Sequence, residues 1–296
     1  MKVGIDCASC LFHRGYMEIL EATKDPSLRF EATRFLFNLL AENFKPTAIP
    51  SDLGTMRDRL IKRITGNPDP YAEKKHMSNQ KALEIIPLAD KIISAESTVE
   101  GRFRKSCLCA ITGNIIEFDI PGHNFDFNDL KRLVYEAEKD LVIDDILEAY
   151  KLACEASLIL YLTDNAGEIA FDTLFVRELR GTGARVIVAV KDRPISNDAT
   201  LEDARYVGME KVVDSLITIG TDTMGLSLSG CSDEFLKYYK SAEMVVAKGM
   251  GYAETITEIN INSPHFLLLR TKCMNVANFF GVERYKNIAK LLYPDK

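Results

Sequence analysis

The chain has 296 residues, of which 47% are apolar and 27% are charged, an ordinary composition for a globular protein. Its net charge of −6 argues against a nucleic-acid-binding protein, because such proteins usually present a basic face. Apolar runs such as residues 158–162 are far shorter than the roughly 20 residues that span a bilayer. The first residues do not have the pattern of a signal peptide. We therefore expect a cytoplasmic protein that binds neither nucleic acid nor a membrane.

Residues 1–110 show helical patterns and no convincing strand. Apolar residues recur at helical spacing from Leu53 to Ile64, and Ser51 is the predicted N-cap of that helix. The glycine and prolines of residues 66–71 predict a turn, and Pro87 predicts a break or kink in the helix that follows. We predict a mainly helical domain over residues 1–110, onto which the C-terminal helix could pack.

From about residue 150, short β-rich runs alternate with helical stretches. We predict strands over residues 157–162, 185–190, 244–247 and 265–269, which is the last clear strand in the sequence. We predict helices over residues 168–180, 201–206, 233–240 and 272–280. Continuous apolar strands separated by helices are typical of a mostly parallel sheet that is covered on both faces. The sequence therefore predicts a second, α/β domain over residues 111–296.

The seven cysteines are an odd number spread along the chain, which argues against a framework of disulfides. Two pairs are closely spaced, Cys7 with Cys10 and Cys107 with Cys109. These four thiols could form a second metal site, for zinc or for an iron centre. The favoured interpretation is that they are buried or redox-sensitive thiols.

Polar residues follow three of the predicted strands, and also the short apolar run of residues 216–219, at the point where each segment ends. They occupy residues 163–168, 191–198, 220–223 and 248–251. In open α/β sheets, ligands bind beyond the carboxyl ends of the strands. These segments are therefore expected to meet at one edge of the sheet.

The chemistry of this edge favours a metal and a phosphate. The oxygens of Asp164, Asn165 and Asp198 are hard ligands that suit Mg²⁺ or Mn²⁺. A lysine next to glycines, as in Lys248-Gly249-Met250-Gly251, suits a phosphate group. Each segment alone could be only a turn or a helix N-cap. Together, a cation and a lysine are what phosphoryl transfer requires, because charge on the phosphoryl oxygens must be stabilised.

These residues also resemble the signature of a known family. The sequence Asp164-Asn165-Ala166-Gly167-Glu168, the later Asn197-Asp198, and Lys248-Gly249-Met250-Gly251 with Glu254 resemble the damage-control phosphatase family, also known as domain of unknown function 89. Cys7 and Cys10 resemble the CxxC of one of its subfamilies. The segments Asp69-Pro70-Tyr71, Gly113-Asn114-Ile115-Ile116 and Lys272-Cys273 also resemble family positions, so the match extends over nearly the whole chain.

The resemblance implies a helical N-terminal domain packed on a Rossmann-like, three-layer α/β/α domain. It implies a divalent cation (Mg, Mn, Co or Ni) that is held by Asp164, Asn165 and Asp198. It also implies hydrolysis of small phosphate esters, such as sugar phosphates or damaged phosphometabolites. Lys248 would bind the phosphate. The remaining site predictions are the backbone of Gly249 and Gly251, with Glu254, and Asn114, Asp119 and Asp69 reaching in to line the substrate pocket.

Two points of chemistry stay open in the sequence. Met250-Gly251-Tyr252 stands where the family often has Gln-Gly-Asn, which puts side-chain contacts near the phosphate in question. The attacking group could be a water activated by the metal, or Asp164 acting as a covalent nucleophile. Haloacid-dehalogenase phosphatases carry a second aspartate two residues after the nucleophile, and here that position is Ala166, which argues against that mechanism.

Two functions of other classes are alternatives to the phosphatase. One is a carboxyl methyltransferase that uses S-adenosylmethionine, an activity associated with a branch of the family. The other is a protein that binds a phosphometabolite without turnover. The single glycine after the first predicted strand argues against the methyltransferase, because Rossmann-like methyltransferases usually have a glycine-rich loop there.

Overall fold

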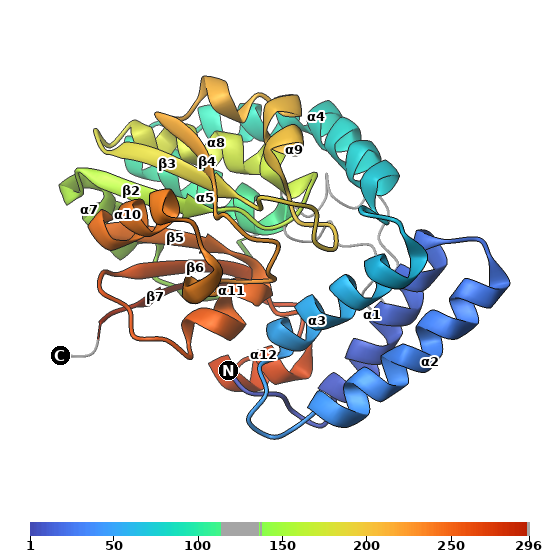
Figure 1. Ribbon diagram of the computed structural model, residues 1–296. Helices are drawn as coiled ribbons and strands as arrows, with labels where there is room; N and C mark the ends of the chain where they lie inside the picture. The colour runs from blue at the N-terminus through green and yellow to red at the C-terminus, as the bar shows by residue number, and fades with distance from the viewer. Residues whose placement is uncertain (114–135, 137, 295–296) are drawn as a thin grey trace.

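The structure is a computed structural model that describes residues 1–113, 136 and 138–294. Its first three helices are α1 (Cys7–Ala22), α2 (Pro26–Asn43) and α3 (Pro50–Thr65), and they form a bundle beside the rest of the molecule (Figure 1). Ile19, Ala32, Leu36 and Ile61 make a small core within this bundle. The bundle therefore has an interior of its own, which agrees with the predicted helical N-terminal region.

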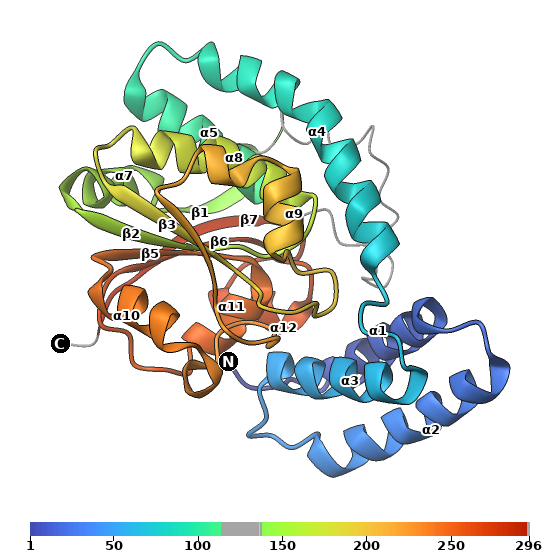
Figure 2. The same ribbon diagram turned by 45° about the horizontal axis from the view of Figure 1, so that its top comes forward.

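The next two helices, α4 (Ala72–Ser94) and α5 (Val99–Gly113), belong to the α/β part rather than to the bundle. Helix α5 packs on α8 and on strands of the sheet, and α4 packs outside them on α5, α8 and α9. Figure 2 shows α4 leading away from the bundle toward α8 and α9. Ile85 and Phe103 belong to the same apolar cluster as the sheet residues. The domain boundary near residue 110 stays a prediction, although α4 and α5 share the core of the α/β part. Helix α4 also continues through Pro87 instead of breaking there.

Within the described residues, the sheet has seven strands in the order β1-β7-β6-β5-β2-β3-β4. All neighbouring pairs are parallel except β6 and β7, which are antiparallel. The strands are β1 (Leu141–Asp144), β2 (Leu158–Leu162), β3 (Arg185–Val190), β4 (Ser215–Thr218), β5 (Met244–Lys248), β6 (His265–Arg270) and β7 (Asn287–Leu292).

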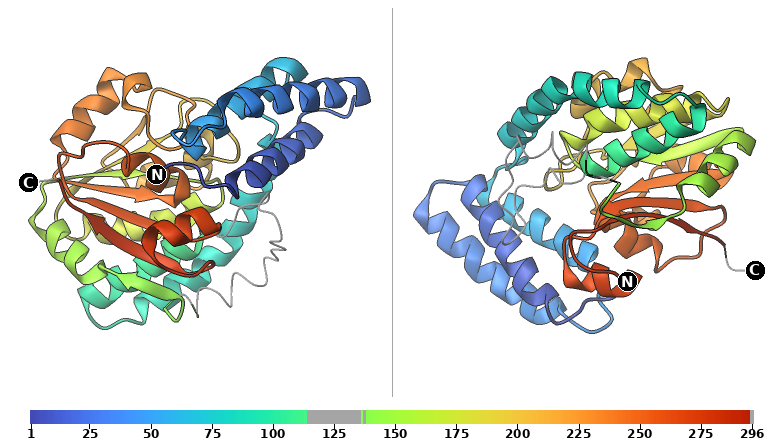
Figure 3. Two further views of the ribbon diagram at one scale, coloured as in Figure 1. Left: turned by 90° about the horizontal axis from the view of Figure 1, so that it is seen from below. Right: turned by 180° about the vertical axis from the view of Figure 1, so that it is seen from behind.

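Helices cover both faces of this sheet because alternate strand residues point to opposite sides. Ile159 and Tyr161 of β2 join the cluster beneath α4, α5 and α8, whereas Leu160 and Leu162 join the cluster on the other face. Figure 3 shows the three layers, with the α1–α3 bundle to one side in both views. The predicted three-layer α/β/α fold with a mostly parallel sheet is confirmed. The covering helices not yet given are α7 (Ile146–Glu155), α8 (Glu168–Arg180), α9 (Leu201–Tyr206), α10 (Asp233–Ser241), α11 (Gly249–Ile256) and α12 (Met274–Phe280).

Several predicted elements have the predicted bounds, including α8, α9 and β3. The prediction that residues 265–269 form the last strand is wrong, because β7 follows and pairs with β6. Lys290 interrupts the apolar pattern of β7 and forms an ion pair with Asp145 at 3.0 Å. The Ser51 N-cap is also wrong. Helix α3 begins at Pro50 after Ile49, and the Ser51 hydroxyl bonds Glu254 instead.

No helix in the described part of the chain is long and apolar enough to cross a bilayer.

Candidate functional site

The candidate site lies at the point where the order of the strands reverses. From β2 the chain moves outward through β3 and β4, and it then returns to β5, which is the other neighbour of β2. The loops after β2 and β5 consequently leave in opposite directions and open a crevice between them, where ligands of α/β folds usually bind. Asp164 and Asn165 follow β2, Gly249 follows β5, and Asp198 lies in the loop after β3.

The loops after β2 and β3 are held together by backbone hydrogen bonds. Asn165 and Asp198 form an antiparallel backbone pair. The Ala199 N–H donates to the carbonyl of Asp164 at 2.7 Å, and the Ala166 N–H donates to the carbonyl of Asn197 at 2.9 Å. The structure therefore brings together the three residues that the sequence predicts as metal ligands.

The carboxylate of Asp164 lies directly against the backbone of Gly249. Gly249 has φ +84°, and a Cβ added to it would lie 1.8 Å from Asp164 Oδ2. Only glycine both adopts this conformation readily and leaves that space. Gly249 therefore leaves the space in which the Asp164 carboxylate lies against the backbone.

The side chain of Asn165 is buried and oriented by its amide nitrogen. Nδ2 donates to Asp164 Oδ2 and to Glu168 Oε2, both at 2.9 Å. The amide oxygen, Oδ1, is buried and has no hydrogen-bond partner among the described residues. Because buried polar atoms are nearly always satisfied, this oxygen calls for a ligand.

A hard cation fits this donor set. Carboxylate and amide oxygens are the ligands that Mg²⁺ and Mn²⁺ prefer. The unpartnered Oδ1 belongs to Asn165, which follows Asp164 in the chain and pairs through its backbone with Asp198. In the described part of the chain, no group of three or more His, Cys, Asp or Glu side chains is arranged to hold a metal ion. A cation here would therefore depend on the amide oxygen of Asn165.

Lys191, at the end of β3, is a site residue that the sequence did not single out. Its ammonium is buried 3.5 Å from Asp198 Oδ2. It donates to the Gly225 carbonyl at 3.0 Å and to the Tyr252 hydroxyl at 3.2 Å. Burial lowers the pKa of Lys191, but Tyr252 and Asp198 more than offset this, so the pKa is raised and the cation persists. The available signal was a lysine that ends an apolar strand.

Lys248 is fully buried and its ammonium is already engaged. It bonds Glu168 and Asp172, the latter at 2.8 Å, and it donates to the Ala110 carbonyl at 2.8 Å. An ammonium has three donors, so these partners use all of them. Burial lowers the pKa of Lys248, but Asp172 and Glu168 outweigh this and raise it. Lys248 is thus connected to the site through Glu168, which accepts a hydrogen bond from Asn165. The direct contact of Lys248 with phosphate stays a prediction.

A cavity of about 130 Å³ lies between the helical bundle and this edge of the sheet. The carboxylates of Asp164 and Asp198 line it from the sheet side, together with the predicted residues Gly251 and Glu254. Its lining also contains three cationic side chains, from Arg14, Arg57 and Lys272. The cavity therefore combines oxygen ligands with positive charge, which suits an anionic molecule bound beside a metal.

Of the other predicted residues, Asp69 lies away from this cavity. Asp69 lines a separate cavity of about 80 Å³ between α4 and α9, where its carboxylate forms an ion pair with Lys75 at 2.6 Å. It does not line the cavity that contains Asp164. Asn114 and Asp119 lie outside the described residues.

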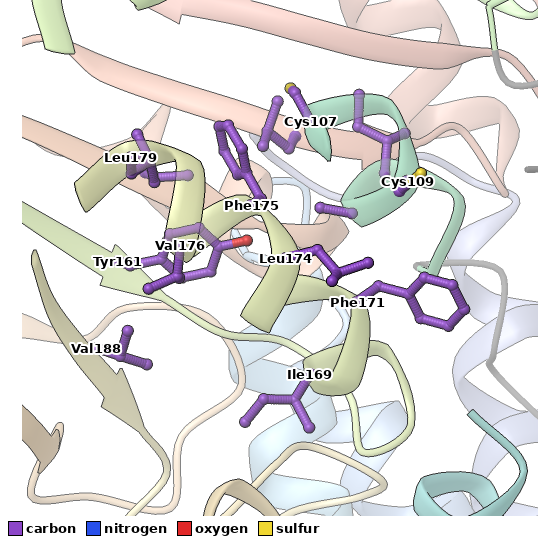
Figure 4. Close-up of a cluster of buried hydrophobic side chains, with 14 of the residues drawn as sticks. Cys107, Cys109, Tyr161, Ile169, Phe171, Leu174, Phe175, Val176, Leu179 and Val188 are labelled. Atoms are coloured by element: carbon purple, nitrogen blue, oxygen red, sulfur yellow. The ribbon is translucent and has the colours of Figure 1, made fainter. Parts of the chain in front are cut away.

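The two cysteine pairs lie in different places. Cys7 and Cys10 line the cavity together with Cys273. Cys107 and Cys109 are buried in the core under α8 (Figure 4), where burial raises the pKa of Cys109 to about 12. All these thiols are free. The structure does not bring the two pairs together, so it does not support the four-thiolate metal site.

Comparison with known proteins identifies the family. The model of the Damage-control phosphatase ARMT1-like domain matches residues 4–288. The chain belongs to this family. The predicted resemblance is thereby confirmed, whereas the CxxC subfamily stays a prediction.

Other members of the family match over almost their whole length. A protein of Archaeoglobus fulgidus named damage-control phosphatase is 35% identical over 296 residues, which cover 99% of this chain and 100% of the relative. A damage-control phosphatase of Pyrococcus horikoshii is 34% identical over 286 residues, or 96% of each chain. The crystal structure of a DUF89 family protein from P. horikoshii superposes with a TM-score of 0.87 at 34% identity, covering 100% of both chains.

Proposed function

We propose that this chain is a metal-dependent phosphatase that hydrolyses phosphate monoesters of small metabolites, such as sugar phosphates or damaged phosphometabolites. The observation that carries the proposal is the buried Oδ1 of Asn165, which has no hydrogen-bond partner among the described residues. Asn165 adjoins Asp164 and pairs with Asp198, and both aspartates line a cavity that also contains Arg14, Arg57 and Lys272. The relatives named damage-control phosphatases support the same reaction class.

Asp164, Asn165 and Asp198 would hold the divalent cation, with Mg, Mn, Co and Ni as candidates. When bound, the cation supplies Lewis-acid stabilisation of the charge on the phosphoryl oxygens. The chain's own residues prepare the ligands. Gly249 seats the Asp164 carboxylate, and Glu168 holds Asn165 Nδ2 so that Oδ1 remains available.

Two buried lysines balance the charge of these carboxylates. Lys191 lies 3.5 Å from Asp198 Oδ2, and Lys248 neutralises Glu168 and Asp172. Lys248 supports Glu168, which in turn holds Asn165, while its direct contact with phosphate stays a prediction. The small cavity encloses the ester beside the carboxylates and limits the access of water, which strengthens electrostatic interactions there.

The test is phosphate release from a panel of phosphate esters in Mg²⁺, Mn²⁺, Co²⁺ or Ni²⁺, and after chelation. We expect turnover that requires a metal and that falls by more than about 100-fold in Asp164→Ala, because electrostatic catalysis is commonly of that size. Asp192→Ala is the matched control, since Asp192 is an exposed aspartate one strand end away that bonds Thr218. Turnover that survives chelation or Asp164→Ala contradicts the proposal.

The two alternatives make different predictions. A methyltransferase requires S-adenosylmethionine binding, which calorimetry on the same protein measures directly. A non-catalytic binding protein is stabilised thermally by a phosphate ester but releases no phosphate. Metal-dependent release without S-adenosylmethionine binding separates the phosphatase from both.

A further inference from the structure

Arg57 of α3 points a buried guanidinium toward the cavity. The residue is only 2% exposed, yet it is one of the residues that line the cavity. Its Nε donates to Glu18 Oε2 at 3.2 Å. No described residue accepts a hydrogen bond from its two Nη groups. These groups are therefore available to an anion in the cavity, to which a guanidinium donates strong, charge-assisted hydrogen bonds.

The fold makes room for this side chain at Gly15 of α1. A Cβ at Gly15 would lie 2.9 Å from Cδ of Arg57 and 2.5 Å from Cδ2 of Leu36. The missing side chain lets the stem of Arg57 lie across α1, where Glu18 fixes the orientation of the guanidinium. The position of Arg57 is therefore built by α1 and α3 together and is not that of a loose surface arginine.

Asp58, next to Arg57 in α3, connects this helix to the loop that carries Asp198. The Asp58 carboxylate accepts a hydrogen bond from the Ser196 N–H at 2.8 Å, and Ser196 precedes Asp198 by two residues. Ser196, Asp198 and Arg57 all line the one cavity. Arg57 thus faces the space beside the proposed metal ligands from the bundle side.

The partner of Arg57 is itself a buried carboxyl group. Burial raises the pKa of Glu18 to about 8, even though Arg57 acts to lower it. Glu18 thus orients the guanidinium through its Nε group.

We propose that Arg57 binds the phosphoryl group of the substrate through its two Nη groups. This inference rests on the proposed phosphatase function and deepens it by naming a phosphate ligand contributed by the helical bundle. A planar guanidinium can give two parallel hydrogen bonds to two oxygens of a phosphate. Substrate binding would then join the bundle to the sheet, because the metal ligands come from one and the arginine from the other.

The experiment measures the affinity of the full chain for inorganic phosphate by calorimetry in the presence of Mn²⁺, and separately its affinity for Mn²⁺. In Arg57→Gln we expect phosphate affinity to fall by roughly 10- to 100-fold, the value of a hydrogen bond to a charged group, with Mn²⁺ affinity within about twofold of the wild type. Arg57→Lys keeps the positive charge but loses the planar pair of donors. Its phosphate affinity should therefore lie between those of the wild type and Arg57→Gln. Arg63→Gln, which removes an exposed arginine from the same helix, is the control and leaves both affinities unchanged.

Removing Arg57 leaves Glu18 buried without its partner, so the double variant Glu18→Gln/Arg57→Gln tests the same point without that charge. We expect it to melt near the wild type and to show the same loss of phosphate affinity. Unchanged phosphate affinity in either folded variant, or an equal loss of Mn²⁺ affinity, overturns the inference. If Arg57→Gln loses phosphate affinity but the wild type releases no phosphate from any ester, the proposed function fails and the anion ligand stands.

Discussion

The backbone N–H of Ser196 donates a 2.8 Å hydrogen bond to the buried carboxylate of Asp58, which joins helix α3 to the loop that leads into Asp198. Ser196 has φ +47°, a left-handed conformation that is uncommon for a residue with a side chain. Lys62 forms an ion pair with Asp58 at 2.6 Å and donates to the Pro194 carbonyl at 2.5 Å. The helical bundle therefore holds the loop that supplies one of the proposed metal ligands.

Removing the Asp58 carboxylate is expected to affect both stability and metal binding. In Asp58→Ala, Lys62 and the Ser196 N–H lose their buried acceptor, which should reduce the free energy of unfolding by about 3 kcal/mol. The loop should also lose its fixed geometry, so Mn²⁺ affinity should fall. Asp58→Asn keeps an acceptor oxygen and should show a smaller change in both. Urea unfolding and Mn²⁺ titration check this, and an Asp58→Ala protein with wild-type Mn²⁺ affinity contradicts it.

A methyl group at Gly249 is expected to displace Asp164. In Gly249→Ala the new Cβ would lie 1.8 Å from Asp164 Oδ2, so we expect phosphatase turnover to fall by more than about tenfold. The matched control is Gly281→Ala, because Gly281 also has positive φ (+68°) but has no atom within 4 Å of the added Cβ. That control should lose about 1 kcal/mol of stability from backbone strain alone and keep its turnover. Equal losses of turnover in Gly249→Ala and Gly281→Ala would contradict the proposal that Gly249 leaves space for the Asp164 carboxylate.

Replacing Lys248 is expected to lower the free energy of unfolding more than replacing a partly exposed lysine does. In Lys248→Met, Glu168 and Asp172 remain buried without a cation, and we expect a loss of about 3–5 kcal/mol in the free energy of unfolding. Lys290→Met removes a half-buried lysine that pairs with Asp145, so its loss should stay below about 1 kcal/mol. Urea unfolding of both variants at one pH makes the comparison.

The loss in Lys248→Met should also depend on pH. Burial already raises the pKa of Asp172 from 3.8 to about 6. A carboxyl with a raised folded-state pKa binds its proton more tightly in the folded protein, so stability decreases as pH rises from about 4 to about 6. Without Lys248 this window extends to higher pH, and the variant should be closer to wild type at pH 5 than at pH 8. A loss that is equal at both pH values contradicts this account.

His265 is expected to make the protein less stable in mild acid. Burial lowers the pKa of His265 to about 4 from 6.5, and its ring bonds the Tyr239 hydroxyl at 3.0 Å and the Ser263 carbonyl at 2.7 Å. The unfolded chain therefore takes up a proton at a higher pH than the folded protein does. The contribution of His265 to the free energy of unfolding is fully present above about pH 6.5. It falls by as much as about 3 kcal/mol as the pH drops to 4.

Thermal melting of His265→Gln between pH 7.5 and 4.5 checks this expectation. The variant should lose less stability over that interval than the wild type, although it starts lower. His76→Gln removes an exposed histidine and should follow the wild-type pH profile. A His265→Gln profile parallel to the wild type would show that His265 does not cause the acid sensitivity.

Local patterns were sufficient to predict the elements that carry the proposed metal ligands. The apolar run before Asp164 and the helix after it have the predicted bounds within a residue, because a buried parallel strand and an amphipathic helix are each defined by periodicity over neighbouring residues. Strand ends then indicated the edge where Asp164, Asn165 and Asp198 meet. The strand β7 was missed because Lys290 breaks its short apolar pattern and because its pairing with β6 is a long-range contact.

The sequence by itself determined the family and the fold class, and it named the oxygen donors proposed for the metal, since all of these are encoded in contiguous motifs. Only the tertiary structure decided which buried charges face the cavity. It places Arg57 there and encloses Lys248 between Glu168 and Asp172, although both residues look equally available in the sequence. The physical reason is that a cation's role depends on which carboxylates and which empty spaces other segments bring to it, and contacts such as Gly15 with Arg57 join positions far apart in the chain.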